Sequence, residues 1–181
     1  MRGERAPSST AFPYGAISVG GGWLALTDGQ TATARATTVG ARDLALFDLA
    51  LDYATCTRLA MSRADICSDS VWDAAVGTMQ AAGVAVSSVD DVAGLVVMRT
   101  VAMLANEAAD AVNQKIATAH DVDLAMQKGV NYPIGPLAWA ERLGPARVRD
   151  VLVHLGSHYG GDRYRVSPLL ARCSASGRPL A

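Results

Sequence analysis

A glycine-rich segment, GGGWLA at residues 20–25, has the residue types that could hold a dinucleotide. It formally fits the pattern G-x-G-x-x-A, in which backbone N–H groups at a helix start bind a pyrophosphate. That pattern needs a strand before the glycines, whereas here a strand-like run, residues 23–27, follows them. The expected strand-to-helix turn is instead TDGQ at residues 27–30, whose Asp28 would repel a phosphate. The segment therefore favours a degenerate or merely similar α/β layer over intact dinucleotide binding.

Asp48 has the spacing of a ribose-binding acid. It lies near the end of a second strand-like run, residues 43–49. In dinucleotide-binding folds an acid about 20 residues after the phosphate turn contacts the ribose. Without a glycine loop in the right place, this acid does not make a site, so we expect this chain alone to bind no cofactor.

Two histidines could share a metal ion. His154 and His158 are four residues apart on a predicted helix, a spacing that suits zinc. They lack the glutamate of H-E-x-x-H, and with Arg147 and Asp150 they form the polar stripe of that helix. His120 falls in the first turn of another predicted helix, a normal exposed place. We therefore predict no metal site and assign no catalytic residue.

Arginines are concentrated in the last forty or so residues. They could hold the phosphates of an anionic ligand, because a guanidinium matches phosphate geometry. They could equally pair with acids across an interface. The group comprises Arg142, Arg147, Arg149, Arg163, Arg165, Arg172 and Arg178.

The segment GVNYPIGP, residues 129–136, forms a rigid corner between two predicted helices. Tyr132 precedes a proline and is pushed toward extended backbone, Pro133 and Pro136 fix φ, and Gly135 permits a turn. Such a corner either only aims two helices or carries function, since loops do both.

Composition narrows the class of protein. The chain has 181 residues, is 50% hydrophobic and has a formal net charge of −1, so it can bury a core and carries no overall field for nucleic acid or a membrane surface. Its three cysteines form no C-x-x-C pair, and the first residues contain no apolar signal segment. We expect a cytoplasmic protein with no nucleic-acid or membrane partner.

The hydrophobic periodicity predicts two regions after a polar lead, residues 1–14. Residues 15–90 alternate strands (23–27, 43–49, 84–88) with helices (31–40, 53–64, 70–82), which implies a small parallel α/β layer. From residue 94 only helical segments follow, so residues 91–181 are predicted to form a helical domain, with the boundary near residues 88–93. Predicted helices there are 94–113, 119–129, one starting at Pro136, and 146–159.

Three segments of the helical region resemble the C-terminal domain of 3-hydroxyacyl-CoA dehydrogenases, especially the bacterial 3-hydroxybutyryl-CoA and phenylacetate-pathway type. They are GLVVMRTVAMLANEAADAV, HDVDLAMQKGVNYPIGPLAWAERLG and HYGGDRYRVSPLL, and the similarity covers about residues 90–172. In longer members of the family this domain occurs twice, with a reduced α/β segment similar to residues 15–90 between the copies. The resemblance thus implies a small degenerate Rossmann-like α/β layer followed by an all-α domain, the second half of such an enzyme.

The resemblance implies NAD-dependent oxidation of a 3-hydroxyacyl-CoA to the 3-ketoacyl-CoA. In the family a histidine oriented by a glutamate, within His-x-Phe-x-Pro, belongs to the N-terminal nucleotide-binding domain, and this chain lacks that motif. A substrate-positioning asparagine of the family is replaced here by Met98, and a thioether cannot replace an amide. The chain alone is therefore expected to be inactive. The substrate-binding residues that the resemblance indicates are Arg99, Asn131, Tyr132, Pro133, Gly135 and Pro136.

Two hypotheses follow. In the first, the chain is the C-terminal portion of a dehydrogenase and supplies helical packing, dimer contacts and acyl-CoA contacts, with NAD held by the parent enzyme's N-terminal nucleotide-binding domain. In the second, it is a non-catalytic acyl-CoA-binding or assembly module that kept the fold and lost the chemistry. Both predict a homodimer, because a small helical module with an apolar long helix exposes more apolar surface than it can hide.

Overall fold

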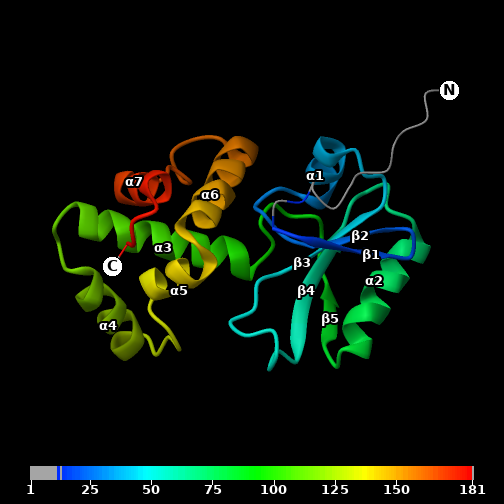
Figure 1. Ribbon diagram of the computed structural model, residues 1–181, viewed down its shortest axis with the longest axis horizontal. Helices are drawn as coiled ribbons and strands as arrows, with labels where there is room; N and C mark the ends of the chain where they lie inside the picture. The colour runs from blue at the N-terminus through cyan, green and yellow to red at the C-terminus, as the bar shows by residue number, and fades with distance from the viewer. Residues whose placement is uncertain (1–11, 13, 181) are drawn as a thin grey trace. The chain divides into compact units, whose positions relative to one another are not determined.

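The computed structural model describes residues 12 and 14–180. It divides into two compact units, Met1–Met98 and Arg99–Ala181. Strands and two helices make up the first unit, and helices alone continue through the second (Figure 1). This order confirms the predicted fold class, a small α/β layer followed by an all-α domain.

The first unit is a five-stranded sheet with the strands in sequence order. Helices α1 and α2 make the connections between the parallel pairs β2–β3 and β4–β5, whereas β1–β2 and β3–β4 are antiparallel. The elements are β1 (Ala16–Val19), β2 (Gly22–Leu26), α1 (Ala32–Val39), β3 (Leu44–Phe47), β4 (Arg58–Arg63), α2 (Asp69–Ala81) and β5 (Ala85–Ser88).

Both faces of this sheet are covered. Leu44 and Leu46 pack in one apolar cluster with Ala36 of α1, whereas Ala45 packs in another with Ala75 of α2. Successive residues of β3 thus enter different clusters, as the alternation of side chains along a strand requires.

Two details of the predicted layer are wrong. The sheet is mixed and not parallel. Strand β1, which was not predicted, pairs antiparallel with β2, and β3 returns to an antiparallel β4 without a helix between them. The helix predicted over residues 53–64 is instead β4. Leu59 and Met61 are buried at a spacing of two, and pairing with β3 and β5 overrides the helix preference of Leu, Ala, Met and Arg.

The second unit is built on α3 (Val97–Asn113), whose first two residues belong to the first unit, followed by α4 (Ala119–Gly129), α5 (Pro136–Leu143), α6 (Pro145–Tyr159) and α7 (Pro168–Ser176). Helices α6 and α7 pack against each other (Figure 1). The predicted bounds of α4 are confirmed, with Thr118 accepting a hydrogen bond from the N–H of Asp121 as its N-cap. Helix α4 has no buried residue, unlike α5, α6 and α7. Among the described residues no helix is long and apolar enough to cross a membrane.

Candidate functional site

The glycines at residues 20–22 form a β-hairpin turn. Val19 pairs with Gly22, and the two residues between them, Gly20 and Gly21, both have positive φ, as a tight two-residue hairpin turn requires. A Cβ at Gly22 would lie 2.6 Å from the Val71 side chain and 2.7 Å from the Asp43 carbonyl oxygen. Turn geometry and close packing against α2 therefore explain the glycines, and they lead into a strand and not into the helix that the dinucleotide pattern needs.

The start of α1 is where the reduced layer would have to bind a nucleotide phosphate. The chain fills this place with its own carboxylate. The backbone N–H of Ala32 donates to Asp91 Oδ1 at 2.6 Å, and that of Thr33 donates to Oδ2 at 2.8 Å. The N–H of Ala34 donates to the side chain of Thr31. Because these first-turn donors are already used, the residues present do not fit a dinucleotide pyrophosphate.

Asp28, the acid of the predicted turn, neutralises a buried arginine. Its Oδ2 lies 3.1 Å from Nε of Arg35, whose side chain is 1% exposed. Nη1 of the same arginine donates to the carbonyl oxygen of Leu26 at 2.6 Å. Burial lowers the pKa of Arg35, and the negative charge of Asp28 opposes that shift. The space beside the turn therefore holds an internal ion pair.

Asp48 caps α3. Its Oδ2 accepts from the N–H groups of Val96 and Val97 at 2.9 and 2.7 Å, and its Oδ1 accepts from Met98 at 2.9 Å and from Leu49 at 2.8 Å. Asp48 is 1% exposed. A carboxylate saturated by four backbone donors has no place for a ribose, so the ribose interpretation of Asp48 is replaced by a helix cap.

The rigid corner between α4 and α5 depends on a second carboxylate cap, which is half-buried. Asp123 of α4 accepts from the N–H groups of Leu137 and Ala138 at 2.8 and 2.9 Å. A Cβ at Gly135 would overlap that carboxyl group. The glycine is therefore required by the close approach of Asp123, and Pro136 takes the first helical position, where no N–H is needed.

Three other predicted substrate-binding residues lie on the outer side of this corner. Asn131 is exposed and has a φ of 58°, in the left-handed region that asparagine tolerates. Tyr132 is half-buried, and its N–H donates to the carbonyl oxygen of Met126. Pro133 is exposed. Their side chains have no interaction that shows a role, so a part in substrate binding stays a prediction.

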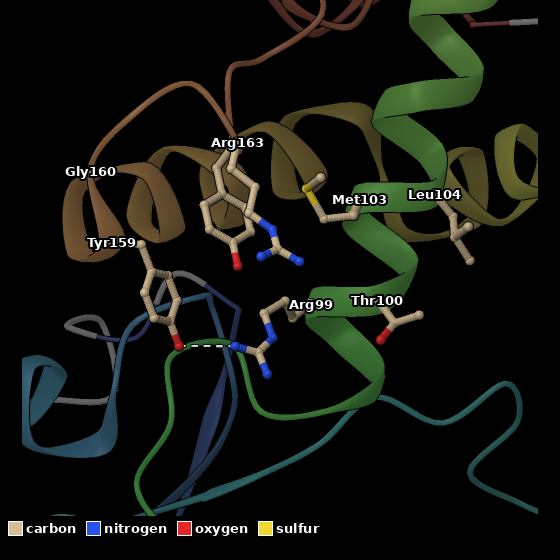
Figure 2. A pocket seen from close by; sticks show the side chains of 8 residues that line it. Arg99, Thr100, Met103, Leu104, Tyr159, Gly160 and Arg163 are labelled. Atoms are coloured by element: carbon tan, nitrogen blue, oxygen red, sulfur yellow. Dashed lines mark hydrogen bonds between the residues drawn. The ribbon is translucent and has the colours of Figure 1, made fainter.

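The sixth predicted residue, Arg99, lines an open cavity of about 690 Å³ within the second unit. Figure 2 shows Arg99, Tyr159 and Arg163 extending into the same space beside α3 and the end of α6. Nη1 of Arg99 donates to the hydroxyl of Tyr159 at 2.9 Å. The full lining is Arg99, Thr100, Met103, Leu104, Tyr159, Gly160, Arg163 and Tyr164, which includes no residue of the corner.

Aromatic rings support both guanidinium groups of this cavity. The Arg99 guanidinium lies 5.9 Å from the ring centre of Tyr159, and that of Arg163 lies 5.9 Å from the ring centre of Tyr164. The two tyrosine rings stack with their centres 5.4 Å apart. We call this group of four residues the Arg–Tyr cavity.

The other predicted ligand groups are not assembled into a site. Arg149 pairs with its neighbour Asp150, and Arg165 pairs with Asp110, so these two arginines contact acids of the chain itself. The ring of His158 meets the ring of Tyr159 edge-on. Within the described part of the chain no group of three or more metal-ligating side chains comes together.

Sequence reasoning missed several residues that organise these places. Asp91 and Asp123 act across chain separations that no local pattern shows. Asn106 of α3 is a polar residue that is only 3% exposed. Its amide accepts from the N–H of Ser167 and donates to the carbonyl oxygen of Arg165. The only available signal was chemical, since these short polar side chains are the usual partners of backbone groups at helix starts and turns.

The fold and these contacts define a class: a reduced Rossmann-like layer, in which Asp91 caps the start of α1, followed by an all-α module. Comparison with protein families agrees. Residues 24–92 match the 3-hydroxybutyryl-CoA dehydrogenase reduced Rossmann-fold domain, and residues 94–179 match the 3-hydroxyacyl-CoA dehydrogenase C-terminal domain. The chain belongs to the 3-hydroxyacyl-CoA dehydrogenase family, which confirms the resemblance read from the sequence.

Individual relatives cover the same region. The chain is 45% identical over 102 residues to the 3-hydroxyadipyl-CoA dehydrogenase of Escherichia coli (strain K12), which is 56% of this chain and 22% of that protein. A crystal structure of 3-hydroxybutyryl-CoA dehydrogenase from E. coli K12 matches 96% of this chain and 38% of its own, with a TM-score of 0.80 and 34% identity. A probable 3-hydroxybutyryl-CoA dehydrogenase of Bacillus subtilis (strain 168) is 34% identical over 89 residues, 49% of this chain and 31% of that protein. The chain thus spans between about a fifth and a third of the length of these curated relatives.

Proposed function

We propose that this chain is the C-terminal portion of an NAD-dependent 3-hydroxyacyl-CoA dehydrogenase. In that role it supplies helical packing, dimer contacts and acyl-CoA contacts, while an N-terminal nucleotide-binding domain holds NAD and carries out the oxidation to the 3-ketoacyl-CoA. The pathway would be fatty-acid or aromatic-acid breakdown. The name of the E. coli relative adds a dicarboxylic, six-carbon acyl group as a candidate substrate for the parent enzyme.

The observation that carries this division of labour is the pair of hydrogen bonds from α1 to Asp91. They occupy the amides that a pyrophosphate bound at α1 would need, which supports the proposal that the cofactor is held by the N-terminal domain. Met98 argues against catalysis by this copy of the domain. It is fully buried, and its apolar side chain stands where the family resemblance expects a substrate-positioning amide.

A second candidate function is a non-catalytic acyl-CoA-binding or assembly module. The buried Met98 favours it, because a parent enzyme that used this copy for catalysis would need a polar group at that position. The three free cysteines suit a reducing compartment and support the proposed cytoplasmic location for either function.

An assay with NADH and acetoacetyl-CoA tests the proposal. We expect no loss of NADH with the 181-residue chain alone. We expect a faster reaction when the chain is added to a separately produced nucleotide-binding domain of the E. coli 3-hydroxybutyryl-CoA dehydrogenase than with that domain alone. The Gly129→Ala chain is the matched control, because a Cβ there meets nothing within 4 Å, and it should stimulate the reaction as well as the wild-type chain does. Turnover by the chain alone at an enzyme-like rate would overturn the proposal, and no stimulation would favour the assembly module.

A further inference from the structure

We infer that the Arg–Tyr cavity binds an oxyanion carried by an acyl-CoA thioester, either a phosphate of the CoA or a terminal carboxylate of the acyl chain. The inference rests on the proposed function for the identity of the thioester. The site itself is argued from the charges, the ring contacts and the lining of the cavity.

The charge of the cavity is uncompensated. Its lining contains two arginines and no acid. None of the ion pairs found in residues 12 and 14–180 includes Arg99 or Arg163, whereas Arg149 and Arg165 each contact an aspartate. Two guanidinium groups that face one space repel each other. An anion between them is attracted by both groups, and this attraction offsets their repulsion.

The two guanidinium groups are held in place before any ligand binds. Tyr159 accepts a hydrogen bond from Arg99, which limits the rotamers of that side chain. Tyr164, only 6% exposed, supports Arg163 from a fixed position. Gly160 and Gly161 both have positive φ, so the chain reverses sharply after α6 and brings Arg163 back beside α3. Preorganised donors bind an anion with less loss of conformational entropy.

The size and the apolar part of the lining fit more than an isolated ion. A volume of about 690 Å³ falls within the usual range for small-molecule sites, roughly 300–1,000 Å³. Met103 provides an apolar side chain next to the arginines (Figure 2). A methylene chain or a pantetheine arm with an anionic end has this combination of chemistry, and guanidinium binds carboxylate and phosphate alike.

Calorimetry on the full 181-residue chain with four ligands tests the inference. Adipyl-CoA and hexanoyl-CoA have acyl chains of equal length and differ in the terminal carboxylate. CoA and 3′-dephospho-CoA differ in one phosphate. A preference within the first pair identifies the carboxylate as the bound anion, and a preference within the second pair identifies the phosphate.

Charge-matched variants identify the cavity as the place of binding. We expect Arg163→Gln to weaken binding of the preferred ligand by about tenfold or more and to remove the preference within its pair, because a charge-assisted hydrogen bond is lost. Arg163→Lys should give an intermediate loss of affinity, since lysine keeps the positive charge but lacks the paired N–H donors of the guanidinium. Arg172→Gln is the control: it removes an equal charge from an exposed residue outside the cavity and should leave binding unchanged.

Equal losses in Arg163→Gln and Arg172→Gln would show a general charge effect and overturn the inference, as would no binding of any of the four ligands at millimolar concentration. The NADH assay is a separate measurement. A chain that binds through Arg163 but does not stimulate the nucleotide-binding domain keeps the inference about the anion and removes the dehydrogenase role.

Discussion

At the scale of single residues, one kind of helix cap recurs through the chain. Aspartates far from a helix in sequence accept hydrogen bonds from its first N–H groups: Asp91 at α1, Asp48 at α3 and Asp123 at α5. A helix start attracts negative charge because its N–H groups lack partners and its dipole is positive there. The chain thus satisfies the N–H groups at the starts of these three helices with its own carboxylates, and at α1 that start follows a parallel strand, as a phosphate site would.

A substitution at Asp48 tests directly how much such a cap stabilises the chain. We expect Asp48→Ala to lower the free energy of unfolding by about 2–4 kcal/mol, because four backbone donors lose a charged acceptor in a buried place. Urea unfolding followed by circular dichroism measures the change. Asp65→Ala, an exposed aspartate of the same unit, should shift stability by no more than about 0.5 kcal/mol. Equal effects of the two substitutions would contradict the role given to Asp48.

The sequence singled out Asp48 by its spacing but did not show which groups it contacts. Its distance from the turn at residues 27–30 can be counted along the chain, and that spacing indicated a ribose. The groups that it actually contacts lie 48 to 50 residues later, at the start of a helix. No local pattern shows a contact of that separation. The Arg–Tyr cavity was hidden for the same reason, because Arg99 and Tyr159 are 60 residues apart.

At the scale of elements, the sequence predicted best where local chemistry decides the outcome. The bounds of α4 follow from Thr118 at its start, and α5 begins at Pro136, as predicted. Strand β4 was predicted as a helix because its residues are good helix formers, and only its neighbours in the sheet make it a strand. Local signals therefore located caps and turns, whereas pairing between strands required the structure.

The corner between α4 and α5 gives a prediction at this scale. We expect Gly135→Ala to destabilise the second unit by about 2–3 kcal/mol, since a Cβ there displaces Asp123 and α5 loses its cap. In an Asp123→Ala background the same glycine substitution should cost much less, because the overlapping carboxyl group is already gone. Chemical unfolding of the four chains gives this coupling.

Gly129→Ala is the matched control for the corner. A Cβ at this last residue of α4 meets nothing within 4 Å, and alanine favours a helix more than glycine does. Its stability should be unchanged or slightly higher. If the effects of Gly135→Ala and Asp123→Ala simply add, the glycine is not there to admit the carboxylate.

At the scale of the whole molecule, the order of an α/β layer and a helical domain could be predicted from the periodicity and from the resemblance of three segments to a known family. The direction of the strands could not. A hairpin through Gly20 and Gly21 and the return from β3 to β4 make two of the four strand pairs antiparallel. Neither the glycines after β1 nor the turn residues before β4 showed which strand each of these two strands would pair with.

Three of the exposed large apolar side chains in the described residues lie on α4 or just beside it. This helix has no buried residue, and Leu124 on it is 41% exposed. Ile116 before the helix is 72% exposed, and Val130 after it is 55% exposed. A group of exposed apolar side chains on one short helix and its flanks is typical of a surface that contacts another protein. A second copy of the chain is the partner that the proposed dimer supplies.

Sedimentation velocity over a range of concentrations tests this surface. We expect the wild-type chain to shift from monomer toward dimer as its concentration rises, and Leu124→Glu to weaken that association by about tenfold or more, because a carboxylate in an apolar contact must lose its hydration. Val153→Glu places the same charge at an equally exposed position on α6 and should leave association unchanged. A wild-type monomer at the highest concentration would exclude self-association, and loss of the dimer in Val153→Glu alone would place the contact on α6. Because both substitutions add one negative charge to a chain of net charge −1, general repulsion cannot produce a difference between them.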